Sequence, residues 1–371
     1  MTRLFTILVF ATIVPLAAQD DPAPGTRVQL GLEPLFQHWS DDGSGWGREF
    51  RQSATLLRAS VPVRDHSHLS LRTSWSDSRL SGGRADAPPV TGLTAVGDVQ
   101  IGWRSMIAPW NLALYLTGNI PSGQTEMAPG ELPVATLLAN GVLGLAVPNV
   151  GQGFNVAPGA TWARTIHPRV AVGAGLSWHY RGAYTPIAAF GEFDPGDEVM
   201  ATTGLDVRLA PGATISIDLS HVRYSADAVD GETVYDAGAK WMVTTRVKQY
   251  VGRHDWYALY RLRSQGPADI PAAGGSRSTL PDNHQIQTGG TLRFGERFHL
   301  GGAVALRRYG TVEGASASFS DGQLWSVTLS PTLVPGQRVA LPVRLGFATG
   351  DFRETGRLNG WQAGLGLALS F

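Results

Sequence analysis

The last eleven residues, WQAGLGLALSF (361–371), alternate large apolar side chains with small or polar ones up to the end of the chain. Trp361, Leu365, Leu367, Leu369 and Phe371 share one parity, and glycine, Gln362, Ala368 and Ser370 occupy the other. A period of two is typical of a strand with one face in an apolar medium. A soluble β-sandwich would bury such a face in its core, so the rest of the chain must indicate which medium this face meets.

The same alternation recurs in segments of about ten residues, which is the length that a tilted strand needs to cross a bilayer. Segments 170–180 and 199–209 show it clearly. In segment 95–104 it places Ala95, Gly97, Val99, Ile101 and Trp103 on one face, and Val96, Asp98, Gln100, Gly102 and Arg104 on the other. The repeated period predicts a large sheet of strands that span a membrane.

The connections between these segments alternate between short and long. Seven short turns are expected at 64–68, 107–110, 167–169, 210–212, 251–255, 295–298 and 334–337. Eight longer polar links are expected at 40–45, 80–92, 121–152, 181–197, 225–232, 264–283, 310–322 and 353–360. This pattern predicts an all-β fold, a transmembrane up-and-down antiparallel β-barrel of about 16 strands with short periplasmic turns and long extracellular loops. Counts of 14 or 18 strands are the alternatives.

The N-terminus, MTRLFTILVFATIVPLAAQD (1–20), has a basic residue, an uncharged apolar stretch and small residues before Asp20. This order predicts a signal peptide over residues 1–19 and a single barrel domain over 20–371. The alternative is a membrane anchor, but the apolar run is short and contains Pro15. The expected location is the outer membrane of a Gram-negative-type bacterium.

Composition narrows the function classes. The 30 basic and 30 acidic residues balance, so nucleic acid is not an expected partner, and the absence of cysteine excludes disulfides and thiolate chemistry. The chain is rich in Gly (46) and Trp (11). Glycine packs on strongly curved strands, and tryptophan is favoured at membrane interfaces. No nucleophile-elbow, P-loop or dinucleotide signature occurs in a suitable context. We therefore expect no enzyme, no cofactor and no metal site.

The terminal Phe371 resembles the C-terminal aromatic residue that outer-membrane barrels present to the assembly machinery. The alternative is an exported soluble β protein that happens to end in Phe. The expected partners are outer-membrane lipid and lipopolysaccharide, the barrel assembly machinery and a small-molecule solute.

The small or polar parity of the strands should face the lumen, where barrels are polar. The lumen-lining candidates are Arg72, Asp98, Gln100, Arg104, His179, Asp206, Arg208, Asp218, Arg246, Gln285, Gln287 and Arg293. The alternative for each is that it pairs with a neighbour and braces the wall. Charges of both signs are compatible with a water-containing or plugged lumen.

The apolar run VATLLANGVLGLAVP (134–148) lies within the longest loop, where simple solvation would be costly. We expect this run to fold into the mouth and form an apolar constriction from Leu137, Leu138, Leu143, Leu145 and Val147. The alternative is that Val142 to Val147 forms a strand of its own, which would change the strand count.

Three stretches resemble the outer-membrane family associated with meta-pathway phenol degradation: TAVGDVQIGWRSMI (94–107), NLALYLTGNIPSGQ (111–124) and VGQGFNVAPGATWARTIHPRVAVGAGLSWHYRG (150–182). Ser122 stands where that family more usually has Thr. The matching positions are Gly97, Asp98, Pro121, Gly123, Gly151 and Gly153. The resemblance covers about a quarter of the chain and implies a barrel that passes hydrophobic aromatic compounds. No Asn-Pro-Ala plug signature of the related fatty-acid transporters is present.

The expected function is therefore an outer-membrane channel for passive uptake of small, hydrophobic or aromatic molecules. The alternatives are a general aqueous porin and a structural or surface-interaction barrel without a transport role.

Overall fold

The computed structural model describes residues 27–41, 48–82, 90–187, 191–278, 280–312 and 319–371. The expected signal peptide, residues 1–19, lies outside the described residues and stays a prediction, as does the exact start of the barrel domain. Parts of the predicted loops 40–45, 80–92, 181–197, 264–283 and 310–322 also lie outside them.

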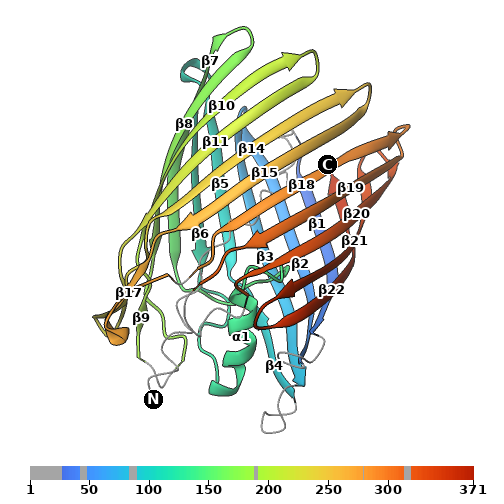
Figure 1. Ribbon diagram of the computed structural model, residues 1–371. Helices are drawn as coiled ribbons and strands as arrows, with labels where there is room; N and C mark the ends of the chain where they lie inside the picture. Colours follow the sequence, from blue (N-terminus) through green and yellow to red (C-terminus); the bar gives the residue numbers. More distant parts are fainter. Residues whose placement is uncertain (1–26, 42–47, 83–89, 188–190, 279, 313–318) are drawn as a thin grey trace.

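One antiparallel sheet of eighteen strands closes on itself and forms a barrel (Figure 1). Its first nine strands are β1 (Gln29–Asp41), β2 (Arg48–Arg64), β3 (Ser67–Gly82), β4 (Val90–Val96), β5 (Val99–Ile107), β6 (Leu112–Ile120), β7 (Asn155–His167), β8 (Val170–Arg181) and β10 (Glu198–Ala210). Its last nine are β11 (Ala213–Tyr224), β14 (Lys240–Val251), β15 (His254–Gln265), β18 (Asn283–Phe294), β19 (Phe298–Tyr309), β20 (Gly322–Gly336), β21 (Val339–Phe352), β22 (Gly356–Leu365) and β23 (Leu367–Ser370).

These eighteen strands make sixteen crossings of the wall. β4 and β5 pair with β3 one after the other, and β22 and β23 follow one another along β1. The barrel closes where Leu35 of β1 pairs with Gly364 of β22 and Leu32 of β1 pairs with Leu367 of β23. The prediction of an all-β up-and-down barrel of about 16 strands is confirmed.

The remaining elements lie in the loops. They are two small sheets, one of β9 (Phe193–Asp194), β12 (Asp227–Val229) and β13 (Glu232–Tyr235) and one of β16 (Ala268–Ile270) and β17 (Gly275–Arg277), and the helix α1 (Leu132–Ala139). All seven predicted short turns lie at one end of the barrel, near the C-terminus, and α1 lies at the other end (Figure 1). Among the described residues, no helix is long and apolar enough to cross a membrane.

The predicted eighth link is shorter than expected. β21 and β22 remain paired up to Phe352 and Gly356, so residues 353–355 alone form the turn, and most of RETGRLNG (353–360) is strand. The polar composition of this segment suggested a loop, but residues 356–360 belong to β22 and pair with β21.

The outer face of the barrel is apolar, with aromatic residues towards both ends. Eight of the eleven Trp side chains are among the exposed large hydrophobic residues. Trp361 and Leu365 on β22 are 46% and 56% exposed, and Phe371, which follows β23, is 59% exposed. Such an exterior is stable only in lipid, and its two aromatic bands are typical of membrane interfaces. The chain is therefore a transmembrane β-barrel of the outer-membrane type, and the Leu face of the closing strand faces lipid.

Segment 95–104 differs from the prediction of one continuous strand. Trp75 lies opposite Val96 and Arg72 lies opposite Gln100, so three residue steps on β3 match four on its partner. The extra residue is accommodated at Gly97–Asp98, between β4 and β5, as in a β-bulge.

This irregularity reverses the parity of the segment. Before it, Ala95 is buried and Val96 is 49% exposed on the lipid side; after it, Ile101 is 40% exposed on the lipid side. The predicted placement of Ala95 and Ile101 on one face was therefore wrong, because a simple period of two cannot include an inserted residue.

Candidate functional site: the inward-folded loop and the inner wall

The connection between β6 and β7, residues 121–154, folds into the barrel rather than away from it (Figure 1). A short 3-10 turn, Pro129–Glu131, leads into α1, whose first turn contains Pro133, a residue that is favoured there because it needs no hydrogen-bond acceptor. Residues 142–147 form no strand. The alternative of an additional strand at Val142 to Val147 is therefore excluded.

The apolar side chains of this loop pack against the inner wall. Leu137, Leu138, Leu143, Leu145 and Val147 are between 1% and 8% exposed. The four leucines share one apolar cluster with wall residues from eight neighbouring strands, namely Trp39 (β1), Phe50 (β2), Leu80 (β3), Leu93 (β4), Tyr309 (β19), Leu324 (β20), Phe352 (β21) and Leu358 (β22). Each fully buried side chain of this size contributes roughly 1.5–3 kcal/mol to docking. The five predicted residues thus fasten the loop to the wall and do not present an apolar surface to the open lumen.

Two inward-facing glutamines bind the loop backbone. Gln52 Nε2 donates to the carbonyl of Val147 at 2.9 Å, and the amide of Val147 donates to Gln52 Oε1 at 3.1 Å. On the neighbouring strand, the amide of Ala146 donates to Gln37 Oε1 at 2.6 Å, and Gln37 Nε2 donates to the carbonyl of Gly144 at 3.2 Å. Gln52 is 0% exposed and Gln37 3%, so these bonds form out of contact with water, where an unpaired amide is costly.

Asp98 fixes both ends of the same loop. The amide of Gly123 donates to Asp98 Oδ1 at 2.9 Å, and the amide of Gln152 donates to Oδ2 at 2.7 Å. Asp98 is 7% exposed. Its carboxylate was predicted to line the lumen, but its position in the irregularity between β4 and β5 turns it to the loop root instead.

The positions that carry the family resemblance meet at this root. Ser122 Oγ accepts from the amide of Val99 at 2.9 Å, next to Asp98. A Cβ atom at Gly123 would lie 2.8 Å from the carbonyl oxygen of Val96, and one at Gly151 would lie 2.7 Å from that of Gln124. Both glycines are therefore needed for the close approach of the backbone.

The other predicted lumen residues lie on the face that also carries Gln37 and Gln52. Directly paired residues point to the same side of a sheet. The register pairs Arg72 with Gln100, His179 with Glu198, Asp218 with Gly204, and Gln285 with both Arg261 and Arg307. By the same alternation, Arg104, Asp206, Arg208, Arg246, Gln287 and Arg293 belong to this inner face. Their role in transport stays a prediction.

Some of these charges brace the wall. Arg293 Nη2 lies 3.1 Å from Asp255 Oδ2, and Ser216 Oγ donates to Asp206 Oδ1 at 2.5 Å. Arg344 Nη2 lies 3.0 Å from Glu33 Oε1, and Arg58 lies 3.7 Å from Oε2 of the same carboxylate. Sequence analysis missed Glu33, Arg344 and the two docking glutamines, although all four lie on the inward face of their strands.

Two charged residues, Arg181 and Asp227, hold the loops at the α1 end together. Arg181 Nε donates to the carbonyl of Gly196 at 2.5 Å, and the amide of Gly196 donates to Asp227 Oδ1 at 2.6 Å. Burial raises the pKa of Asp227, while the Gly196 amide and Arg181 act in the opposite direction. Burial also raises the pKa of Tyr184 in this loop region to about 12. Among the described residues, no group of three or more His, Cys, Asp or Glu could hold a metal ion.

The sequence matches no protein-family model and no curated protein. Among solved structures, the chain is similar to OprD from Pseudomonas aeruginosa (11% identity, 93% of this chain and 95% of that chain, TM-score 0.48). It is also similar to an anion-selective porin from Comamonas acidovorans (12% identity, 93% of this chain and 99% of that chain, TM-score 0.44). A further similar structure is an outer-membrane channel from Pseudomonas putida F1 (13% identity, 95% of this chain and 98% of that chain, TM-score 0.40). Because these sequence identities and TM-scores are low, the function has to be argued from the barrel itself.

Proposed function

We propose that the chain is a passive channel of the outer membrane that admits small molecules past a loop folded into its lumen. The observation that carries this proposal is the docking of loop 121–154 inside the barrel by Gln37, Gln52 and Asp98. Barrels of this strand number leave an aqueous lumen that wall side chains do not fill. A docked loop narrows that lumen and limits the size of the solute.

We further propose that the solutes are hydrophobic or aromatic, as the resemblance to the meta-pathway phenol-degradation family implies. The apolar loop residues do not support this step, since they are packed against the wall. The support comes from the resemblance itself, whose positions Asp98, Gly123 and Gly151 build one loop root.

The test is solute flux through purified, refolded protein in liposomes. L-arabinose and phenol are compared at matched gradients, and protein-free vesicles give the direct leakage through lipid, which is subtracted. Faster entry of phenol than of arabinose would support a channel for aromatic compounds. Equal acceleration would favour a general aqueous porin, the second candidate, which the charged inner wall also permits. No acceleration of either solute by a folded barrel would contradict the channel and favour a structural or surface-binding role.

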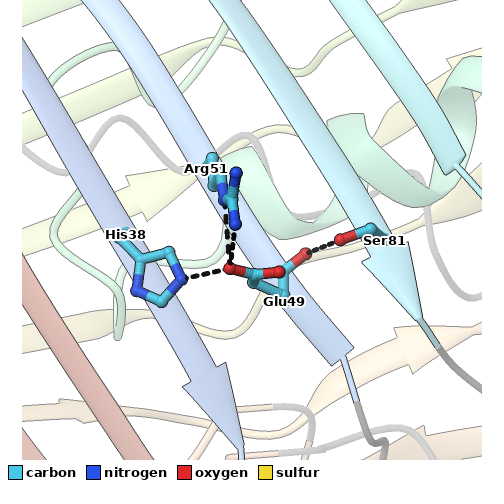
Figure 2. Close-up of polar contacts among 4 residues, drawn as sticks. All are labelled: His38, Glu49, Arg51 and Ser81. Atoms are coloured by element: carbon cyan, nitrogen blue, oxygen red, sulfur yellow. Dashed lines mark hydrogen bonds and ion pairs between the residues drawn. The ribbon is translucent and has the colours of Figure 1, made fainter.

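Lipopolysaccharide is a proposed partner at the α1 end of the outer face. Figure 2 shows Glu49 between His38 and Arg51: His38 Nε2 lies 2.6 Å from Glu49 Oε1, and Arg51 Nε donates to the same oxygen at 3.0 Å. Phe50 and Gln52 point inward, so Glu49 and Arg51 face outward. The Arg51 side chain is 56% exposed, which leaves it accessible to a lipid phosphate.

Phe371, on the outer face at the opposite end, is the proposed assembly signal.

A further inference from the structure

Three arginines cluster on the inner wall beside the docked loop. Arg261 and Arg263 are two residues apart on β15, and Arg307 is on β19. In the register, Arg261 and Arg307 lie on either side of Gln285, directly opposite it on the two neighbouring strands. The two arginine backbones are therefore about 10 Å apart, twice the spacing between strands, and their long side chains can reach one small group between them.

This arginine cluster carries uncompensated charge. Among the described residues, none of the three guanidinium groups forms an ion pair, whereas Arg58, Arg181, Arg293 and Arg344 on the inner wall all do. Arg261 Nε donates only to the hydroxyl of Thr244, at 3.3 Å. Like charges held together on a wall raise the local concentration of counter-ions.

The cluster also contains buried polar atoms without a partner. Arg263 Nε is buried and has no acceptor, and both amide atoms of the nearby Gln265 are buried with no hydrogen-bond partner among the described residues. Buried polar atoms are normally satisfied, so an unpaired donor next to a set of cations indicates a missing acceptor. An oxyanion would supply that acceptor and neutralise part of the charge.

The cluster borders the part of the wall on which the loop packs. Arg307 lies directly opposite Leu324, and Arg263 lies opposite Asn283, which is itself opposite Tyr309. Leu324 and Tyr309 belong to the apolar cluster on which the loop packs. The three arginines thus begin where the loop-covered part of the wall ends, and a solute that passes the loop at this level meets them.

We propose that the arginine cluster is a binding site for the carboxylate of a small solute. Arginine suits this role because its planar fork binds a carboxylate through two parallel hydrogen bonds. This inference rests on the proposed channel function and narrows its substrate class to organic acids, including aromatic acids.

The test is made on planar bilayers that contain the purified full-length protein at pH 8. Reversal potentials are measured first in a KCl gradient and then with potassium benzoate opposed to KCl, where protonated benzoic acid crossing the lipid carries no current. We expect the wild-type channel to be anion-selective and added benzoate to block the chloride current at a saturating concentration. Inorganic phosphate, tested in the same way, distinguishes a carboxylate site from a general oxyanion site.

The variants are Arg261→Gln with Arg307→Gln, and Arg261→Lys with Arg307→Lys. The Gln pair should abolish most of the anion selectivity and raise the half-blocking benzoate concentration at least tenfold, as expected for the loss of a charge-assisted contact. The Lys pair should keep the anion selectivity but weaken the block. The matched control is Arg308→Gln, because Arg308 follows Arg307 on the same strand and points to the outer face.

The outcomes separate this proposal from the channel function. If L-arabinose enters liposomes but benzoate neither permeates nor blocks, the carboxylate site is wrong and the channel stands. If phosphate blocks as well as benzoate, the carboxylate assignment is overturned in favour of a general oxyanion site. If no solute and no ion passes through the folded protein, the channel function itself fails.

Discussion

Gln52 and Val147, which are 95 residues apart in the sequence, exchange two hydrogen bonds inside the barrel, at 2.9 and 3.1 Å. The side-chain amide of Gln52 thus binds the loop backbone as a neighbouring strand would, with one donor and one acceptor. Because Gln52 is fully buried and also donates to Ser78 Oγ at 3.1 Å, it has a defined orientation.

We predict that Gln52→Leu loosens the loop. The substitution leaves the amide and carbonyl of Val147 buried without partners, at a cost of about 1–3 kcal/mol for each group. Single-channel conductance should rise and become noisier, and hydrogen exchange at Val147 should accelerate. The control is Gln323→Leu, on the outer face of β20. Equal conductance in the Gln52 variant and the wild type would show that this pair does not hold the constriction.

Asp98→Asn should release one end of the loop. An amide side chain offers one acceptor oxygen, so it cannot accept from both Gly123 and Gln152, and its NH₂ group would face one of the two backbone donors. We expect faster hydrogen exchange at one of these two amides and a higher conductance. Asp351→Asn, at an exposed outward position, serves as the control. Unchanged exchange at both amides would contradict the role of Asp98.

Replacing residues 134–148 with a short Gly-Ser linker should enlarge the conductance to small ions. The linker removes the apolar side chains that dock on the wall, so it should also lower the thermal stability of the barrel. Folding is checked by the heat-dependent mobility of the barrel on gels. A folded variant with the wild-type conductance would mean that this loop does not limit the pore.

Acid should stabilise the folded loop that buries Asp227. Its folded pKa is raised by burial, so the folded loop takes up a proton more readily than the unfolded one. The contribution of Asp227 to stability is therefore greatest below the ordinary carboxyl pKa and is lost as the pH rises through the raised folded value. Protection of the Gly196 amide, corrected for intrinsic exchange, should be higher at pH 4 than at pH 7.

Asp227→Asn provides the matched variant for this prediction. Its neutral side chain can still accept from Gly196 at every pH, so the dependence of protection on pH should disappear. A variant that keeps the wild-type pH dependence would assign the effect to another group.

Much of the barrel was predictable because its determinants are local. The alternation in WQAGLGLALSF (361–371) and the seven short turns lie within single hairpins, and a period of two assigns their faces directly. The irregularity at Gly97–Asp98 was not predictable, since one inserted residue changes the faces without changing the composition.

The docking contacts were also beyond sequence analysis. Gln37 and Gln52 lie on the inward face of their strands, as many other polar residues do. Their role depends on a loop about a hundred residues away in the sequence. The apolar run 134–148 was expected to fold into the mouth, but the eight wall strands that share a cluster with its side chains could be known only from the closed barrel.

The docked loop also bears on the order in which the barrel forms. The apolar residues of segment 134–145 come from the middle of the chain, yet they share one cluster with Trp39 of β1 and Leu358 of β22, the two strands whose pairing closes the barrel. Gln37 donates both to this loop and to Gln362 across that junction, at 3.2 Å in each case. Contacts on both sides of the junction form together only after the first and last strands have paired. The complete set of docking contacts therefore exists only in the closed barrel, where it opposes reopening between the two terminal strands.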